Sequence, residues 1–243
     1  MVYPKNIELP VFFKILNKKY LQGFLDGNLY MNNLKYFVDL ERKTGQRGIG
    51  DIREGSLCNI SKHQLFIQYE GGERKEIEIG PPPGIVYDEE ALEHPIFCMV
   101  GKIFIQDKIS DKEYSCSVSL QRDLLKDFVG GQEDDFCVVM IVNCFEFLER
   151  VEKALVKEGC SAKSGFIQYR NISMPNIKDG QWVLDNTFTK DVCFRNQSEY
   201  RIEIFKQCKE PFVLPIGDIR DLAGVLTVNQ IEKGFTVLQR ILE

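Results

Sequence analysis

The stretch RNQSEYRIEIF, residues 195–205, alternates polar and apolar side chains with a period of two. This alternation predicts a β-strand, because successive side chains of a strand point to opposite faces. One face would carry Gln197, Glu199, Arg201 and Glu203. Glu199 and Glu203 would lie about 13 Å apart on an extended strand, too far to divide acid and base roles between them. Glu199 with Gln197 is therefore the sharpest pairing, on a face that looks either into solvent or into a cleft.

A second polar group lies in the loop-like stretch RGIGDIREGS, residues 47–56. Its glycines permit positive φ, and Arg47 and Arg53 supply forked hydrogen-bond donors. Asp51 and Glu54 add two carboxylates, which alone are too sparse to predict a metal ion. We expect this loop to hold a phosphate or a ribose, or to fold over a ligand as a lid. The alternative is a mobile, solvated loop.

A third group combines FFKIL (12–16) with LYMNNLKYF (29–37). Lys14 interrupts an otherwise apolar strand, and Tyr30 and Tyr36 flank a turn that we expect at Asn32 and Asn33. These side chains are candidates for ligand contact. The alternative is structural: Lys14 lies at a sheet edge with its stem packed, and the tyrosines belong to the core with solvated hydroxyls.

The remaining pattern predicts the elements that must position these groups. Strands are expected over residues 11–17, 63–69, 75–80, 95–105, 134–144 and 164–172, the second and third forming a hairpin. Helices are expected over 18–27, 119–130 and 145–159, and a terminal amphipathic helix closes the tail of residues 214–243. In the helix over 145–159, the inner stripe is Phe147, Leu148, Val151, Ala154 and Leu155. Residues 134–144 form a nearly continuous apolar run, which predicts a strand buried on both faces.

Strands and minor helices are thus intermixed over the whole chain. We predict one α+β domain over residues 1–243, built around a mixed, curved or split β-sheet with a few amphipathic helices. The stretch 80–95 contains three consecutive prolines, so we expect a loop or linker excursion there. The GQRGIG stretch (45–50) is neither preceded by a buried strand nor followed by a helix, and it is therefore not a dinucleotide-binding fingerprint.

The cysteines and histidines do not form a metal-binding pattern. None of the eight cysteines lies in a Cys-x-x-Cys pair, and the only histidines are His63 and His94. We expect no metal site, and we interpret the cysteines as reduced, small, buried hydrophobes.

The charge and hydropathy of the sequence limit which partners we expect. With 31 basic and 36 acidic residues the net charge is −5, which argues against broad electrostatic capture of nucleic acid or anionic membrane. No apolar run approaches the roughly 20 residues that span a bilayer. The first residues lack the organisation of a signal peptide. We expect a cytoplasmic protein that does not bind membranes.

The order of these groups resembles a set of uncharacterised bacterial and phage proteins with late Phe-Lys and Glu-x-Arg motifs. The segments that carry this resemblance are GNLYMNNLKYF, GDIREG, VVMIVNCFEFLERV, GFIQYRN and QSEYRIEI. More distantly, the chain resembles mono-ADP-ribosyltransferases. Residues 12–37 match their strand, helix, glycine and strand layout, and QSE at 197–199 matches their late motif. The chain departs from that family in having Lys14 where the first strand carries Arg or His.

The second resemblance implies an enzyme that uses NAD as a substrate and modifies a protein or nucleic-acid acceptor, in the setting of phage–host conflict. Glu199 would hold the ribose and stabilise the positive charge that develops on it. Gln197 would orient the acceptor, and Tyr30 or Tyr36 would stack on the nicotinamide. Lys14 would take the place of the first-strand Arg or His, which anchors NAD by hydrogen bonds in that family.

The alternative is a non-enzymatic binding module for a nucleotide-like signal or a protein partner. In that case Arg47, Arg53 and Arg201 would contact phosphate or carboxylate groups. The transferase hypothesis requires that Glu199 share a cleft with Lys14 and Tyr36. An exposed Glu199 on a convex face would exclude it.

Overall fold

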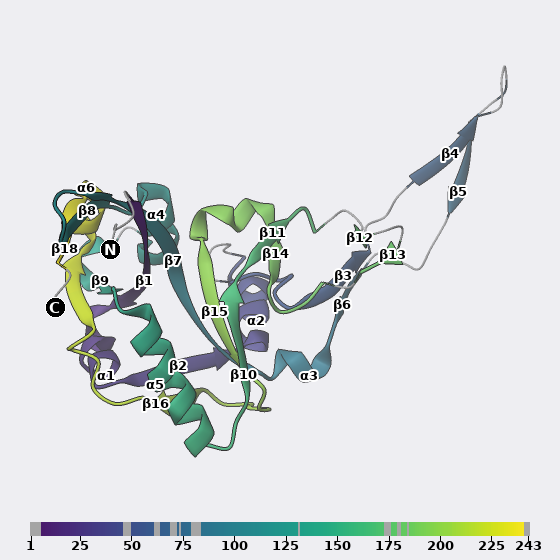
Figure 1. Cartoon of the computed structure of the whole chain (residues 1–243). Helices are drawn as coiled ribbons and strands as arrows, with labels where there is room; N and C mark the ends of the chain where they lie inside the picture. Colours follow the sequence, from purple (N-terminus) through teal and green to yellow (C-terminus); the bar gives the residue numbers. More distant parts are fainter. Residues whose placement is uncertain are drawn as a thin grey trace.

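The computed structural model describes residues 6–45, 50–60, 64–68, 72, 74–78, 84–130, 132–172, 176–178, 181–183 and 185–240. As predicted, the chain is a single α+β domain with one large sheet and several helices (Figure 1). The strands of the large sheet are β1 (Asn6–Asn17), β2 (Asn28–Asn33), β7 (Pro95–Lys108), β8 (Glu113–Val118), β9 (Phe136–Ile141), β10 (Ala162–Phe166), β15 (Glu199–Ile204), β16 (Phe212–Pro215), β17 (Ala223–Thr227) and β18 (Phe235–Arg240). The α-helices are α1 (Leu21–Leu25), α2 (Leu34–Thr44), α3 (Glu89–Leu92), α4 (Arg122–Val129), α5 (Cys144–Lys157) and α6 (Val228–Lys233). Among the described residues, no helix is long and apolar enough to cross a membrane.

The large sheet splits along one edge of β7. Its central order is β10-β15-β7-β1-β9-β17, and the pairings of its described strands are antiparallel. Strand β1 pairs with β7 from Val100 to Asp107 and then turns away to pair with β9. Strand β2 pairs with β7 only at Pro95 and Ile96. Because β15 occupies the other edge of β7 here, β1 and β2 share one edge and diverge on either side of residues 97–99.

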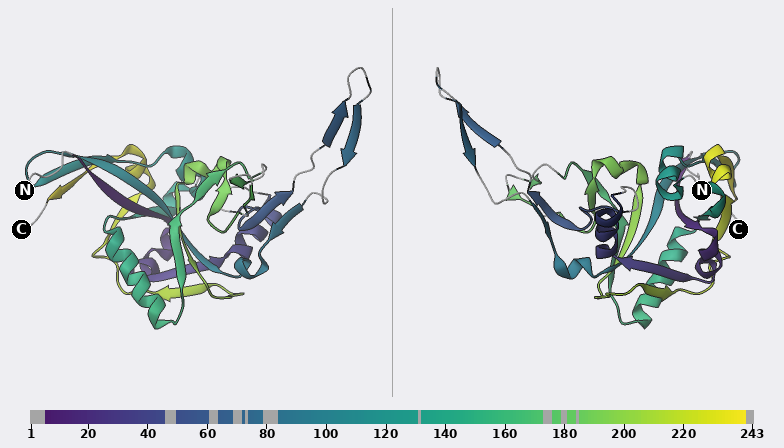
Figure 2. Two further views of the ribbon diagram at one scale, coloured as in Figure 1. Left: turned by 45° about the vertical axis from the view of Figure 1, so that its right-hand side comes forward. Right: turned by 180° about the vertical axis from the view of Figure 1, so that it is seen from behind.

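Helix α5 covers the sheet beside β16 and supplies much of the main core (Figure 2). Phe147, Val151, Ala154 and Leu155 are buried and Leu148 packs against them, which confirms the predicted inner stripe. Strand β9 is buried on both faces, as its apolar run predicts, because β1 and β17 flank it and α5 and α6 lie on its two sides. A second core forms under α4 and α6, around Val11, Phe13, Leu124 and Ile231.

The turn expected at Asn32 and Asn33 is instead the start of helix α2. The side chain of Asn33 accepts a hydrogen bond from the backbone N–H of Tyr36 at 2.9 Å and so caps the helix. Gly45, with φ of 67°, ends it in the left-handed conformation. The sequence did contain signals for this helix: the Asn cap, the apolar spacing of Leu34, Phe37 and Val38, and the closing glycine.

The predicted terminal helix is wrong. Helix α6 spans only Val228–Lys233, opened by a capping box at Thr227 and Gln230. Gly234, with φ of 79°, then turns the chain into β18, which pairs with β8 along its whole length. Tertiary pairing with β8 overrides helix propensity in these last residues, where Phe, Thr and Val also favour a strand.

The middle of the chain forms two successive ribbons, visible at the right of Figure 1. Strand β3 (Ser56–Ile60) pairs with β6 (Gly84–Tyr87), and β4 (Gln64–Gln68) pairs with β5 (Arg74–Glu78). The predicted hairpin is confirmed as β4–β5. The stretch 80–95, expected as a loop or linker, contains β6 and α3. The remaining short strands are β11 (Gln168–Arg170), β12 (Ile177–Lys178), β13 (Gln181–Trp182) and β14 (Thr189–Asp191), with β11 and β14 parallel.

Candidate functional site

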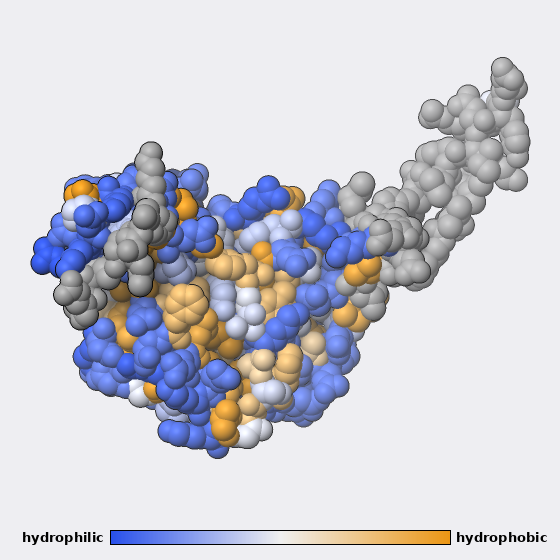
Figure 3. Space-filling view, in the orientation of Figure 1, coloured by the Kyte–Doolittle hydropathy of each residue, from blue (hydrophilic) through white to orange (hydrophobic). Residues whose placement is uncertain are grey.

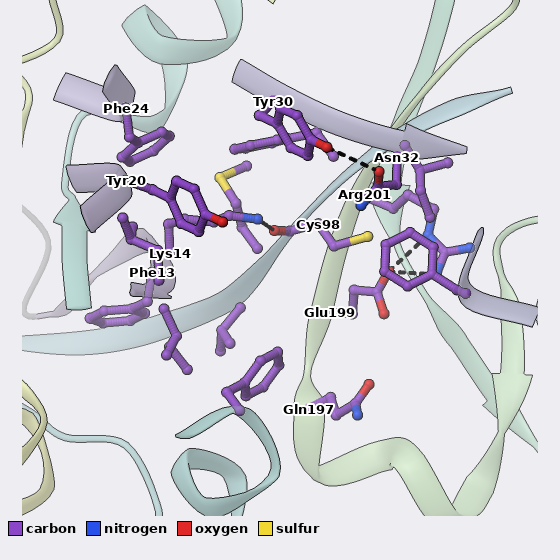
Figure 4. Close-up of a pocket in the computed structure, with 18 of the residues that line it drawn as sticks. Phe13, Lys14, Tyr20, Phe24, Tyr30, Asn32, Cys98, Gln197, Glu199 and Arg201 are labelled. Atoms are coloured by element: carbon purple, nitrogen blue, oxygen red, sulfur yellow. Dashed lines mark hydrogen bonds and ion pairs between the residues drawn. The ribbon is translucent and has the colours of Figure 1, made fainter. Parts of the chain in front are cut away.

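A cavity of about 700 Å³ opens where β1 and β2 part from β7 (Figure 4). This volume lies in the range typical of sites for small molecules and cofactors. Its walls are mainly aromatic and apolar; Figure 4 places Glu199 and Arg201 together at one side and Lys14 apart from them. The aromatic lining comprises Phe13, Tyr20, Phe24, Tyr30, Tyr36, Phe37, Phe97 and Phe128. On the face seen in Figure 3, apolar side chains gather in the middle and hydrophilic ones at the sides.

Strand β2 presents alternate residues to the cavity. Leu29 and Met31 are buried in the core, whereas Asn28, Tyr30 and Asn32 line the pocket on the opposite face. Tyr30 is 57% exposed, so its side chain is accessible at the pocket. Tyr36, on the first turn of α2, also lines the pocket and is similarly exposed.

Lys14 enters the cavity from β1 at the split. Its Nζ donates a hydrogen bond to the backbone oxygen of Cys98 at 2.7 Å and lies 4.3 Å from the centre of the Phe97 ring. Burial lowers the pKa of the Lys14 ammonium, although the charge of Glu199 opposes this shift. Lys14 therefore uses a carbonyl on the unpaired edge of β7 as its anchor.

Four buried ionic side chains meet at the floor of the pocket, and we call Glu54, Lys190, Glu199 and Arg201 the charge quartet. Lys190 Nζ lies 2.7 Å from Glu199 Oε2 and 3.2 Å from Glu54 Oε2. Arg201 Nη2 lies 2.6 Å from Oε1 of both carboxylates. The contact with Glu54 Oε1 is an ion pair without hydrogen-bond alignment. Glu199 is the most exposed of the four, at 6%.

The quartet holds Glu199 in its charged form. Burial alone would raise the pKa of the Glu199 carboxyl, but the charges of Arg201 and Lys190 outweigh burial and hold this pKa well below its usual range. Burial would lower the pKa of Lys190, yet Glu199 and Glu54 raise it above its usual value. The neighbouring Cys98 thiol stays protonated, because burial and the charge of Glu199 raise its pKa to about 12.

The strand predicted over 195–205 is shorter than expected and has no solvated face. It begins at Glu199, and Gln197 ends a preceding 3-10 helix, η3 (Val192–Gln197). All six residues of β15 are buried, because Tyr200, Ile202 and Ile204 pack into the main core on one face, and Glu199, Arg201 and Glu203 meet buried partners on the other. The interpretation of its polar row as a solvent face is therefore wrong. Gln197 and Glu199 both line the pocket.

Glu203 belongs to a separate buried group. Its Oε1 lies 2.8 Å from His94 Nδ1, and its Oε2 accepts a hydrogen bond from Thr187 Oγ1. Thr187 also connects the two groups, because its backbone oxygen accepts a hydrogen bond from Arg201 Nη1. Glu199 and Glu203 thus have different partners, consistent with their spacing along the strand.

The structure gathers six of the nine predicted site residues in one pocket: Lys14, Tyr30, Tyr36, Gln197, Glu199 and Arg201. Arg201 is fully buried and paired with carboxylates, so in the structure it holds Glu199 and Glu54. Asp51 and Arg53 lie outside the pocket lining. Asp51 is buried, and Arg53 lies 3.8 Å from Asp191. Arg47 is outside the described residues.

Sequence reasoning did not assign Glu54 and Lys190 to the site. Glu54 is carried in by a tight turn, in which its N–H donates to the backbone oxygen of Asp51 and Gly55 takes a φ of 66°. Lys190 is the middle residue of β14 and reaches Glu199 from a different sheet. The weak signals were a carboxylate beside a glycine in an otherwise loop-like stretch, and a lysine after the apolar Phe188.

No group of three or more His, Cys, Asp or Glu side chains suited to a metal ion occurs in the described part of the chain. The charges of the pocket floor are instead balanced within the protein. Two carboxylates face one ammonium and one guanidinium, and the set is neutral.

The comparisons with known proteins give no family for this chain. No protein-family model matches it, and neither the curated proteins nor the solved structures yield a match.

Proposed function

We propose that the pocket binds NAD and that the protein transfers ADP-ribose from NAD to a protein or nucleic-acid acceptor. The observation that carries this proposal is the placement of an ionised Glu199 carboxylate at the charged side of an aromatic-walled cavity. The same cavity receives Gln197, Lys14, Tyr30 and Tyr36. A volume of about 700 Å³ accommodates a dinucleotide.

In this reaction the bond between the ribose and the nicotinamide nitrogen breaks, the bonding electrons leave with neutral nicotinamide, and the acceptor bonds to the ribose carbon as it loses a proton. The chain's contribution is electrostatic. Glu199 supplies fixed negative charge beside the place where the ribose becomes positive. Lys190 and Arg201 hold that carboxylate in one position, so it needs little reorganisation when the charge develops.

The polar groups around Glu199 have separate tasks in this proposal. Gln197 would orient the acceptor by its carboxamide, and the exposed rings of Tyr30 and Tyr36 would stack on the nicotinamide. Lys14 would attract the phosphates as a point charge. It cannot replace the planar, two-pronged donor of an arginine, and its bond to Cys98 holds it at the split of the sheet.

A second candidate is a binding module without catalysis, favoured by the saturation of Glu199. Its Oε1 accepts two hydrogen bonds from Arg201, and its Oε2 accepts one from Lys190. A carboxylate with these partners has little capacity left for a ribose hydroxyl. The pocket would then hold a nucleotide-like signal or a segment of a partner protein, with Lys14 and the tyrosines as contacts.

The test measures nicotinamide release from NAD and the mass of ADP-ribose added to components of a bacterial lysate. We expect Glu199→Gln to reduce both by roughly 100-fold or more, since an oriented charge is removed from the reacting centre. Glu203→Gln is the matched control, because it is also a buried carboxylate of β15 but lies outside the pocket lining.

The control variant should keep wild-type rates. If the wild type neither cleaves NAD nor labels any lysate component, while NAD or another nucleotide raises its melting temperature, the binding module is correct. Equal loss in the two variants would remove Glu199 from its proposed role.

A further inference from the structure

Ser198, between Gln197 and Glu199, has an unusual backbone. Its φ is 45° and its ψ is 47°, and it is the one non-glycine residue with positive φ among those described. This left-handed conformation is costly for residues with a side chain, and such residues cluster where function requires a fixed geometry. Ser198 lies between two polar residues that both line the pocket, which suggests a role for the strain.

Strand β7 holds this residue at two points. The Nζ of Lys102 donates a hydrogen bond to Ser198 Oγ at 2.6 Å. The backbone N–H of the preceding Gly101 donates to the backbone oxygen of Ser198 at 2.8 Å. Lys102 is half-buried, and burial lowers the pKa of its ammonium. Side chain and main chain of Ser198 are thus both tied to consecutive residues of one strand.

The turn at Ser198 sets where Gln197 points relative to Glu199, because Ser198 joins the end of η3 to the start of β15. Glu199 has its own anchors: it pairs with Val100 of β7, and its N–H donates to Tyr169 Oη at 2.8 Å. Gln197 is also buried, and its Oε1 accepts a hydrogen bond from Lys190 Nζ at 3.3 Å. Loosening Ser198 would therefore shift the backbone of Gln197 against this bond and leave Glu199 in place.

We propose that Ser198 and Lys102 are positioning residues that fix the carboxamide of Gln197 toward the acceptor. Neither side chain lines the cavity, so they act through Gln197. This inference rests on the proposed transferase function. It adds that capture of the acceptor and cleavage of NAD depend on different parts of the site: the Ser198 turn governs the first, and the quartet around Glu199 governs the second.

The experiment compares Ser198→Gly, Ser198→Asn and Lys102→Met for the ratio of acceptor modification to nicotinamide release. Glycine adopts many other conformations, so we expect this ratio to fall roughly tenfold, since small misplacements of an orienting group cost that much or more. Lys102→Met should lower the ratio in the same way. Asparagine tolerates the left-handed conformation and its side chain can accept from Lys102, so it should keep the wild-type ratio.

A wild-type ratio in both Ser198→Gly and Lys102→Met overturns the proposal, and so does an equal loss in Ser198→Asn. Amide hydrogen exchange measured by NMR tests, without catalysis, whether Lys102 and Gly101 hold Ser198 through their two hydrogen bonds. The Gly101 N–H should exchange faster in Ser198→Gly and Lys102→Met, with Glu199 N–H unchanged. If the wild type cleaves no NAD, the transferase function fails, and only the exchange measurement tests whether β7 holds Ser198. Unchanged exchange of the Gly101 N–H in both variants would then refute the role of Ser198 and Lys102.

Discussion

The Nζ of Lys190 lies 2.7 Å from Oε2 of Glu199, and both side chains are more than nine-tenths buried. Removing two charges from water costs several kcal/mol per ion, and close pairing is what offsets that cost. Glu54 and Arg201 complete the balance, so that each charge of the quartet touches two of opposite sign. The pocket floor is therefore rigid and electrically neutral while its outermost member, Glu199, stays ionised.

Removing the Lys190 charge should destabilise the protein strongly. We expect Lys190→Met to lower the free energy of unfolding by about 3–5 kcal/mol, because Glu54 and Glu199 would then share only one buried cation. Urea denaturation followed by circular dichroism measures this. Lys153→Met is the control: Lys153 is an exposed helix residue paired with Glu149, and its loss should leave stability close to that of the wild type.

Removing the Glu54 charge as well should restore part of the stability that Lys190→Met loses. In Lys190→Met/Glu54→Gln the floor is neutral again, so the double variant should be more stable than Lys190→Met by about 1–3 kcal/mol. Additive losses in this double-mutant cycle would mean that Glu54 and Lys190 do not interact as their 3.2 Å separation implies.

Asp51 predicts a pH dependence of stability. Burial, reinforced by the charge of Glu54, raises the pKa of Asp51 from 3.8 to about 6. Between about pH 4 and 6 the folded protein thus binds a proton that the unfolded chain has released, so Asp51 makes stability fall as pH rises through this window. Its Oδ1 accepts a hydrogen bond from the N–H of Arg53, whereas its buried Oδ2 has no hydrogen-bond partner among the described residues.

The variant Asp51→Asn removes this penalty. The oxygen that accepts from the N–H of Arg53 is retained. We expect the variant to be more stable than the wild type by about 3 kcal/mol at pH 7.5 and nearly equal at pH 4. Thermal unfolding across pH 4–8 measures this. Asp123→Asn, at an exposed site on α4, should follow the wild-type curve, and a parallel curve for Asp51→Asn would contradict the assignment.

Gly27 connects α1 to β2, two elements that line the pocket. Its φ is 83°, and a Cβ at this position would lie 1.8 Å from the backbone oxygen of Gly217. We expect Gly27→Ala to cost about 3 kcal/mol or more, from left-handed strain and overpacking together. Gly23→Ala is the matched control, because a Cβ there meets nothing within 4 Å. It should leave stability unchanged or raise it by about 0.5–1 kcal/mol.

Tyr30 tests the aromatic wall of the pocket under the proposed function. We expect Tyr30→Ala to weaken NAD binding roughly tenfold by loss of ring stacking, whereas Tyr30→Phe keeps the ring and the affinity. The hydroxyl contributes little, since its contact with Asn32 Oδ1 is long at 3.5 Å. Isothermal titration calorimetry with NAD measures both variants. Equal affinities for the alanine and phenylalanine variants would show that the ring does not contact NAD.

Periodicity was a sound guide to the strongly patterned elements. The inner stripe of α5 and the double burial of β9 follow from local sequence, because each carries a long, consistent apolar pattern. The tail was predicted wrongly because its local pattern is ambiguous. Its apolar spacing fits a helix while Phe, Thr and Val favour a strand, and pairing with the edge of β8 makes Phe235–Arg240 a strand.

The residue types of the pocket were present in the sequence: a lysine within an apolar strand, tyrosines after it, and a Gln-Ser-Glu segment late in the chain. By itself the sequence determined that Glu199 and Arg201 share one face of a strand, because alternation follows from backbone geometry. Only the tertiary structure decided what that face meets. Its burial and its charge balance depend on Glu54, from the turn of residues 51–56, and on Lys190, from β14. No local pattern encodes such pairings, because the energy of a buried charge is set by the partners that the fold brings to it.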